Sequence, residues 1–445
     1  MKKDRTLNMT EGSPLRLLVV FALPMLIGNI FQQVYNLVDS VIVGRLVGAD
    51  ALAAIGATNS VTFFFFALCN GFASAGGIIT SQAFGSGKEK DVKNCITNTA
   101  YVMFIMPLVI GTLGFILTGP LLRLLNTPDA IFTDSVLYMR TMCVGMIFVS
   151  LYNLSSSMLR ALGDSKTPLV FLIFSCILNA VLDFIFVYFF KLSVFGAGIA
   201  TVISQIVSGV TCLIYAIRTN PYFKFSKEDA QISREKIKNI LRLGIPLSLQ
   251  FSLIAISCMA LQRVVNSFGA VAVAAFTATS RVEQMIHQPY QTLGTALSTY
   301  CGQNYGAKKM DRLVKGYHTS LLIMAVFTLM MIPLMQFGGS AIMSIFVKDE
   351  AVIEMGAKAL AITSLFYIFL GVIYVVRGVL NGLGDAFFAL LNGIVEVVGR
   401  FTVPILLTMI PTIGLWGIWW SVGIVWFISG FTAWWRYLVY KKRLV

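Results

Sequence analysis

Residues 48–58 read GADALAAIGAT, and residues 269–279 read GAVAVAAFTAT, so one block returns after 221 positions. The same shift of 221 relates two further pairs of blocks: SQAFG at 81–85 with GQNYG at 302–306, and LGD at 162–164 with LGD at 383–385. Three separated blocks in one register are hard to obtain by chance. They predict that the chain is built as two related halves.

The composition places both halves in a membrane. Hydrophobic residues make up 57% of the chain and charged residues 12%, with a mean hydropathy of +0.81. Soluble domains carry roughly twice that share of charge, about 25%. The net charge of +14 does not indicate nucleic-acid binding, because the basic residues lie mainly in short segments between apolar runs. That placement is typical of the positive-inside rule.

Twelve apolar runs are long enough to span a bilayer, since a spanning helix needs about 20 residues. They lie near residues 15–45, 51–83, 95–119, 131–159, 167–190, 196–217, 240–267, 271–303, 316–338, 354–377, 386–409 and 414–438. The first run is too long for the core of a signal peptide, and we expect it to be retained.

Six spans in each half give the halves the same orientation, which is a parallel repeat about an axis along the membrane normal. We expect an all-α polytopic membrane protein with two six-helix bundles around a central cavity. The expected parts are an N-terminal lobe at 1–217, a cytoplasmic linker at 218–239 and a C-terminal lobe at 240–445. The linker contains Pro221 and a charged amphipathic segment at 232–243.

The basic residues predict the orientation in the cell membrane. Placing the N-terminus inside collects most Lys and Arg residues on the cytoplasmic side, including Lys2, Lys3, Arg5, Lys88, Lys90, Lys93, Lys441, Lys442 and Arg443. Both termini are then cytoplasmic.

Asp39 is an ionisable residue inside the first span, where an unpaired charge costs several kcal/mol and indicates function. Pro24 interrupts the same span and permits a kink or hinge. The structural alternative for Asp39 is a hydrogen-bonding role near the outer end of the helix.

Asn179 and Asp183 lie four residues apart in the fifth span and therefore share one helical face. A carboxylate beside an amide oxygen suits a hard cation, or a protonatable group with a hydrogen-bond partner. The pattern alone is weak, but its place in an apolar span favours a functional role.

The second half carries further polar residues within its spans. Glu396 and Arg400 have the spacing of a favourable i, i+4 ion pair, which is more simply a stabilising pair than a ligand site. Arg281 and Glu283 do not share a face and need partners elsewhere. Gln284, and Gln33 in the first half, are more often helix–helix contacts than ligands. We retain these residues as candidate cavity-lining positions.

No nucleotide-binding or catalytic motif is found. Gly85-Ser86-Gly87-Lys88 lacks the first glycine and the final Ser or Thr of a phosphate-binding loop. We therefore expect neither an enzyme nor a cofactor, and uphill transport would draw on an ion gradient.

The order of these blocks resembles the multidrug and toxic compound extrusion (MATE) family of cation-coupled antiporters. The resemblance rests on Pro24, the segment DSVIVG at 39–44, SQAFG at 81–85 with its repeat, and LRALGD at 159–164 with LNGLGD at 380–385. The resemblance covers about residues 12–440.

The resemblance implies a cation site in the N-terminal lobe and a proline hinge on the first helix. The matching positions are Asp39, Asn179, Asp183 and Thr201, with Asn153 as a further polar residue and Pro24 as the hinge. One branch of the family has a second cation site in the C-terminal lobe. Ile254 and the apolar residues near Leu370 stand in its place here, so the sequence favours the N-terminal site.

The resemblance further implies the cargo and the coupling. We expect a monomer that exports small amphipathic, often cationic compounds in exchange for Na⁺ or H⁺, with no nucleic-acid partner and no metal beyond Na⁺ at Asp39, Asn179 and Asp183. The alternative is a lipid-linked oligosaccharide flippase of similar topology, which would need several basic residues in its cavity.

Overall fold

The computed structural model describes residues 6–444, apart from the side chains of residues 37, 40, 49, 255, 258–260 and 442–444. Lys2, Lys3 and Arg5, and the side chains of Lys442 and Arg443, therefore lie outside the described residues. The helices are α1 (Pro14–Leu46), α2 (Ala49–Gly85), α3 (Glu89–Leu124), α4 (Asp129–Ala161), α5 (Lys166–Phe184), α6 (Ser193–Thr219), α7 (Arg234–Asn266), α8 (Ala270–Gly306), α9 (Met310–Phe346), α10 (Glu350–Ser364), α11 (Tyr367–Leu383), α12 (Ala386–Thr408) and α13 (Gly417–Leu444).

The helices confirm the expected all-α class and the span pattern. Nine described helices are long and apolar enough to cross a membrane, and the bent pair of α10 and α11 makes ten. The remaining long helices, α7 and α8, are the least hydrophobic of the set. Counting the bent pair once, α1 to α9, α10–α11, α12 and α13 correspond to the twelve predicted spans.

One of the predicted spans is not a single continuous helix. The run at 354–377 was expected to form one helix, but α10 and α11 meet at a 53° bend after Ser364. Its counterpart in the first half, α4, is continuous. Hydropathy reports the length of an apolar run and is insensitive to a change in its direction.

The repeat is visible in the helix boundaries. The shift of 221 carries α2 onto α8, and both helices are 37 residues long. The residues that precede them, Gly48 and Gly269, have φ of 127° and 87°. Such positive values favour glycine, which has no Cβ to collide with the backbone.

The repeated LGD block is a helix stop followed by a helix start. Gly163 and Gly384 both have φ of 86° and end α4 and α11. The next residue, Asp164 or Asp385, accepts a hydrogen bond from a backbone N–H of the following helix, 2.9 Å from Thr167 N in the first half. The motif thus sets two helix boundaries in each half.

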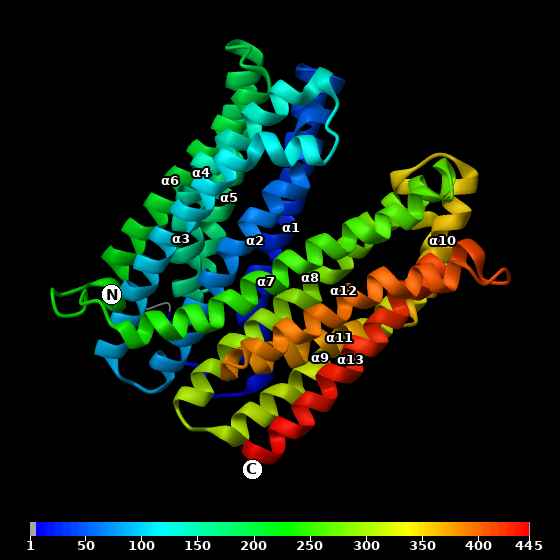
Figure 1. Cartoon of the computed structure of the whole chain (residues 1–445). Helices are drawn as coiled ribbons and strands as arrows, with labels where there is room; N and C mark the ends of the chain where they lie inside the picture. The colour runs from blue at the N-terminus through cyan, green and yellow to red at the C-terminus, as the bar shows by residue number, and fades with distance from the viewer. Residues whose placement is uncertain (1–5, 445) are drawn as a thin grey trace. The chain divides into compact units, whose positions relative to one another are not determined.

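The described chain divides into two compact units. Within the described residues 6–444, the first comprises the residues up to 11 and residues 20–252, and the second comprises residues 12–19 and the residues from 253 onward. In the first unit α4 packs against α2, α3 and α6, and in the second α11 packs against α8, α9 and α13 (Figure 1). The equivalent helix is therefore central in both.

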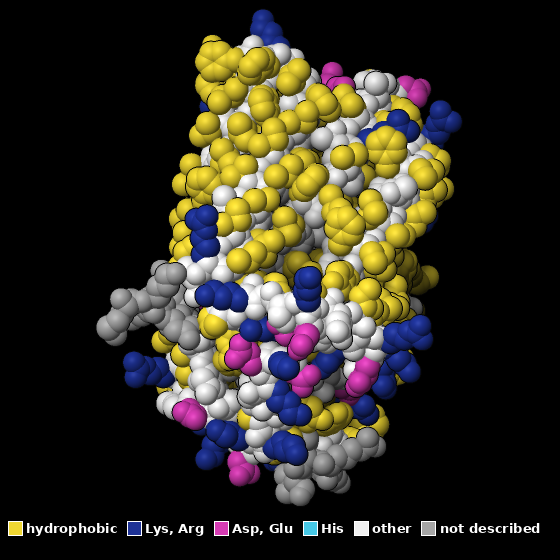
Figure 2. Space-filling model, turned by 90° about the vertical axis from the view of Figure 1, so that its left-hand side faces the viewer, with side chains coloured by type: hydrophobic (Ala, Val, Ile, Leu, Met, Phe, Trp, Pro, Cys, Tyr) yellow, Lys and Arg dark blue, Asp and Glu magenta, His cyan; other side chains and the backbone are white. Residues whose placement is uncertain are grey.

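Figure 2 shows how side chains are distributed on one face of the molecule. Hydrophobic side chains cover most of this face, and Lys, Arg, Asp and Glu gather toward one end. An apolar band beside a charged end is the surface expected of a protein that spans a bilayer.

Candidate functional site: a carboxylate pair in the first unit

The site is assembled from three helices of the first unit. Asp39 lies on α1, Asn179 and Asp183 on α5, and Thr201 on α6. Asp183 is fully buried and Asn179 is 1% exposed. The Asn179 amide nitrogen donates to the Thr201 hydroxyl at 3.3 Å, and this contact joins α5 to α6.

The carboxyl groups of Asp39 and Asp183 lie close enough to interact directly. Both Asp183 oxygens, Oδ1 of Asp39 and Oδ1 of Asn179 are buried and have no hydrogen-bond donor. Ionised carboxylates only accept hydrogen bonds, so neither acid can satisfy the other without a proton or cation between them. The arrangement thus supplies four buried oxygen acceptors to which no hydrogen bond is donated within the described structure.

Two tyrosines that the sequence reasoning did not single out border the pair. Tyr35 on α1 and Tyr138 on α4 both interact electrostatically with Asp39 and Asp183. Tyr35 could have been found from its i, i+4 spacing to Asp39. Tyr138 is distant in sequence and only the tertiary structure reveals it.

The surroundings of the site are apolar and locally irregular. Tyr138 belongs to a buried cluster with Val43, Ala54 and Ala197, which joins α1, α2, α4 and α6. Two residues after Asp183, where α5 ends, the backbone changes to a π-helical turn at Ile185–Phe189. Such turns occur frequently at functional sites, where they change the direction of side chains.

The remaining predicted residues of the first half lie farther away. Asn153 is on α4, 15 residues after Tyr138, and a rise of 1.5 Å per residue separates them by about 22 Å. Asn153 is therefore not beside the carboxyl pair. Pro24 is buried within an unbroken α1, and half-buried Gln33 lies on the same helix.

The second unit contains a different arrangement of charge. Glu396 accepts a hydrogen bond from Arg377 Nη2 at 2.7 Å, and both side chains are buried. Arg377 Nε also donates to Asn392 Oδ1 at 2.9 Å. The prediction that Glu396 pairs with Arg400 was therefore wrong, because a neighbouring helix supplies a closer guanidinium group than the i+4 position.

Arg400 instead lies near other polar groups. Its Nη1 donates to Ser257 Oγ at 3.3 Å, and its guanidinium interacts electrostatically with Glu283 and His287. Glu283 thus has the separate partner that the sequence required. Arg281 and Gln284 are exposed on α8.

The described residues contain no group of three or more His, Cys, Asp or Glu side chains placed to hold a metal ion. The candidate site has two carboxylates, an amide oxygen and a hydroxyl. Oxygen ligands of this kind are the ones that hard cations prefer.

Comparison with known proteins decides the family. Residues 24–185 and 246–411 match the sequence model of the MatE family. These two ranges cover most of both halves. The chain belongs to the MatE family of multidrug efflux transporters.

Relatives match this MatE chain over nearly its full length. The probable multidrug resistance protein YpnP of Bacillus subtilis is 31% identical over 85% of this chain and 84% of its own length. The probable multidrug resistance protein YoeA of the same species is 28% identical, covering 93% of this chain and 91% of its own. The multidrug export protein MepA of Staphylococcus haemolyticus is 22% identical, covering 100% and 97%.

Solved structures share the fold. A MATE crystal structure in the straight conformation superimposes with a TM-score of 0.90 at 23% identity, covering 98% of this chain and 97% of its own. A MATE in the bent conformation has a TM-score of 0.89 at 22% identity, covering 98% and 96%. The expected architecture of a multi-pass MATE transporter is thus confirmed.

Proposed function

We propose that this MATE transporter is a secondary antiporter of the cell membrane that exports amphipathic, often cationic compounds in exchange for H⁺ or Na⁺. The observation that carries the proposal is the cluster of buried, unpartnered acceptor oxygens on Asp39, Asp183 and Asn179. Buried acceptors without donors are costly. A proton or a hard cation removes that cost, so the cluster has reason to take up either one.

Ion binding is coupled to export by charge neutralisation. With both carboxylates ionised, the first lobe attracts a cationic compound. Uptake of H⁺ or Na⁺ at Asp39 and Asp183 removes that attraction and favours a state in which α1 bends near Pro24, and the compound leaves. An ion shifts this equilibrium only by its difference in affinity between the two states, and the two ligands weaken each other reciprocally.

The oxygen set is compatible with either ion. A proton needs only the two carboxyl groups, which can share it. A sodium ion would use both carboxylates, the Asn179 amide oxygen and the Thr201 hydroxyl, since hard cations prefer several oxygen ligands. We expect the protein to act as a monomer with both termini in the cytoplasm.

Purified protein in liposomes tests the proposal. Movement of a fluorescent lipophilic cation such as ethidium is measured under an imposed proton gradient, an imposed sodium gradient and no gradient. The expected result is accumulation under one or both gradients and none without. Equal movement in all three conditions, in protein that binds ethidium, would contradict antiport.

A further inference from the structure

The segment that joins α6 to α7 has little regular structure of its own. Between Thr219 and Arg234 it contains only a short 3₁₀ turn at Pro221–Phe223. A second turn is closed by the Asp229 carboxylate, which accepts from Ser226 N at 2.9 Å and Ser226 Oγ at 2.8 Å. The carbonyl groups that follow have no helical partner and need donors from elsewhere.

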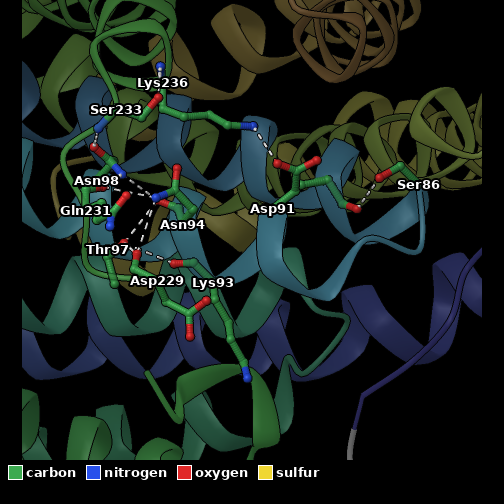
Figure 3. Close-up of polar contacts among 11 residues, drawn as sticks. Ser86, Asp91, Lys93, Asn94, Thr97, Asn98, Asp229, Gln231, Ser233 and Lys236 are labelled. Carbon is green, nitrogen blue, oxygen red and sulfur yellow. Dashed lines mark hydrogen bonds and ion pairs between the residues drawn. The ribbon is translucent and has the colours of Figure 1, made fainter. Parts of the chain in front are cut away.

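Helix α3 supplies the donors (Figure 3). Thr97 Oγ1 donates to the carbonyl of Asp229 at 2.7 Å. The amide nitrogen of Asn94 donates to the same carbonyl at 3.3 Å and to the carbonyl of Gln231 at 3.0 Å. These bonds attach the linker backbone directly to the side chains of one helix.

The same face of α3 continues the attachment. Tyr101 Oη donates to the carbonyl of Ala230 at 2.7 Å. Asn98 uses both ends of its amide: its nitrogen donates to the Gln231 carbonyl at 3.2 Å, and its oxygen accepts from Ser233 N at 2.8 Å. Three consecutive linker carbonyls, 229 to 231, therefore accept from α3.

The sequence spacing of these four residues is i, i+3, i+4, i+7, which places them on one helical face. We call Asn94, Thr97, Asn98 and Tyr101 the α3 stripe. Side chains on one rigid helix give the linker a fixed set of donors.

Ion pairs contribute little to this attachment. Lys90 and Glu228 are 3.5 Å apart with both side chains highly exposed, and Lys236 lies 3.5 Å from Asp91. Exposed pairs are worth about 0–1 kcal/mol. Apolar contacts add more, because Phe223 is buried and Tyr222 packs against Phe84 of α2 with ring centroids 5.4 Å apart.

The stripe is not part of the repeat. The shift of 221 carries its members onto α9 as Lys315, His318, Thr319 and Leu322. This set is chemically unlike the stripe. The repeated architecture does not require those residue types, so the stripe is specific to the half that carries the linker.

The first half of α7 is also held to the first unit. Ser248 Oγ donates to the carbonyl of Leu68 on α2 at 2.5 Å. One turn farther along α2, a Cβ on Gly71 would lie 2.3 Å from Ser248 N, so the two backbones touch. The boundaries between the compact units fall just before α1, inside α1 after Val19 and inside α7 after Ser252, and none of them falls in the linker.

We propose that the four residues of the α3 stripe are positioning residues that make the linker a fixed part of the first unit. Residues 226–233 then move with α3 during transport, and flexing between the linker and the second unit is confined to α7 beyond Ser248. The stripe acts through the linker and does not contact cargo or ion. This proposal uses the family's transport activity and is independent of which ion is coupled.

Hydrogen exchange of the full-length protein tests the attachment. In the variant Thr97→Val/Asn98→Ala/Tyr101→Phe, the first and third changes remove a hydroxyl with little change in volume, and the second removes the carboxamide group. Amides of residues 226–236 should exchange about tenfold faster or more, as expected when several hydrogen bonds are lost, and amides of α8–α13 should not change. The maximal rate of ethidium transport in liposomes should fall several-fold with an unchanged KM, because cargo binding is untouched.

Matched variants separate positioning from general destabilisation. Thr97→Ser keeps the hydroxyl and should behave as the wild type, whereas Thr97→Val should show a partial effect even if the triple variant fails to fold. Thr319→Val on α9, where the hydroxyl bonds only within its own helix, should change neither readout. Unchanged exchange at 226–236 in Thr97→Val would overturn the attachment, and faster exchange with an unchanged transport rate would overturn the positioning role.

Discussion

The repeat shift of 221 carries three residues of the carboxylate site onto unlike residues in the second half: Asp39 onto Ala260, Asn179 onto Arg400, and Asp183 onto Pro404. In the reverse direction Glu283 corresponds to Thr62. In the two halves α2 and α8 begin and end at matching residues. Their ionisable residues within the spans nevertheless stand at different positions.

The difference lies in whether each acid has a basic partner. In the second unit Glu396 is paired with Arg377 at 2.7 Å, and Glu283 interacts with Arg400. Among the residues that the structure describes, Asp39 and Asp183 of the first unit form no ion pair with a basic residue, and they interact with each other and with two tyrosines. An acid that already has a fixed cation gains less from an added ion, so the comparison supports the proposal that ion coupling lies in the first half.

The largest expected effect comes from the carboxylate pair. Asp183→Asn should reduce gradient-driven ethidium transport on the order of 100-fold, near the upper range of coupling between two ligand sites, because the amide cannot change its charge. Asp39→Asn should do the same. Efflux from cells at matched expression measures both. Asp129→Asn, at the exposed start of α4, is the control and should transport like the wild type. Full transport by both Asp39→Asn and Asp183→Asn would contradict the proposal that ion coupling lies in the first half.

Breaking the buried ion pair of the second unit should lower the stability of the protein and leave ion-coupled transport in place. Arg377→Ala leaves Glu396 buried without its cation, a change that typically costs about 3–5 kcal/mol. The thermal midpoint of the purified protein should fall clearly, and Arg377→Met/Glu396→Leu should recover part of the loss. Transport per folded molecule should persist. If a stable Glu396→Gln variant lost ion coupling, the second unit and not the first would carry the coupling.

Much of the fold could be predicted because hydropathy and the repeat are local properties of the sequence. The span at 386–409 corresponds closely to α12 at Ala386–Thr408. The bend after Ser364 was missed, since an apolar run reads the same whether straight or broken.

Residues of the candidate site could be predicted only where they are close together in the sequence, on one helix. Asn179 and Asp183 share a face of one helix and were found by spacing. Tyr138 reaches the same carboxyl pair from another helix, and Glu396 selects Arg377, 19 residues away, over Arg400. Spacing rules describe one helix at a time, so contacts between helices need the structure.

Glu283 should have a smaller role than the carboxylate pair. Glu283→Gln keeps the size of the side chain and leaves Arg400 its bond to Ser257, so we expect transport to change by less than about tenfold and its ion dependence to remain. Initial rates across sodium and proton gradients measure this. Loss of ion dependence in this variant would show a second coupling site.

The smallest effect concerns the linker at low pH. Hydrogen bonds from Ser226 N and Oγ, with Lys93 and Lys90 nearby, lower the pKa of Asp229 below its ordinary value. A lowered folded-state pKa gives stabilisation that is present above the ordinary value of about 3.9 and is lost as pH falls through the folded value. Exchange protection at 226–233, corrected for intrinsic rates, should therefore hold from neutral pH to about 5. Loss of protection already near pH 6 would contradict this.

Binding linkage in purified protein tests most directly whether cargo and ion compete through Asp39 and Asp183. Ethidium binding is measured by calorimetry in buffers of different ionisation enthalpy and at increasing sodium concentration. The account predicts that the wild type releases protons on binding, or binds more weakly as sodium rises, and that Asp39→Asn/Asp183→Asn does neither. The same proton release or sodium dependence in the double variant would contradict it.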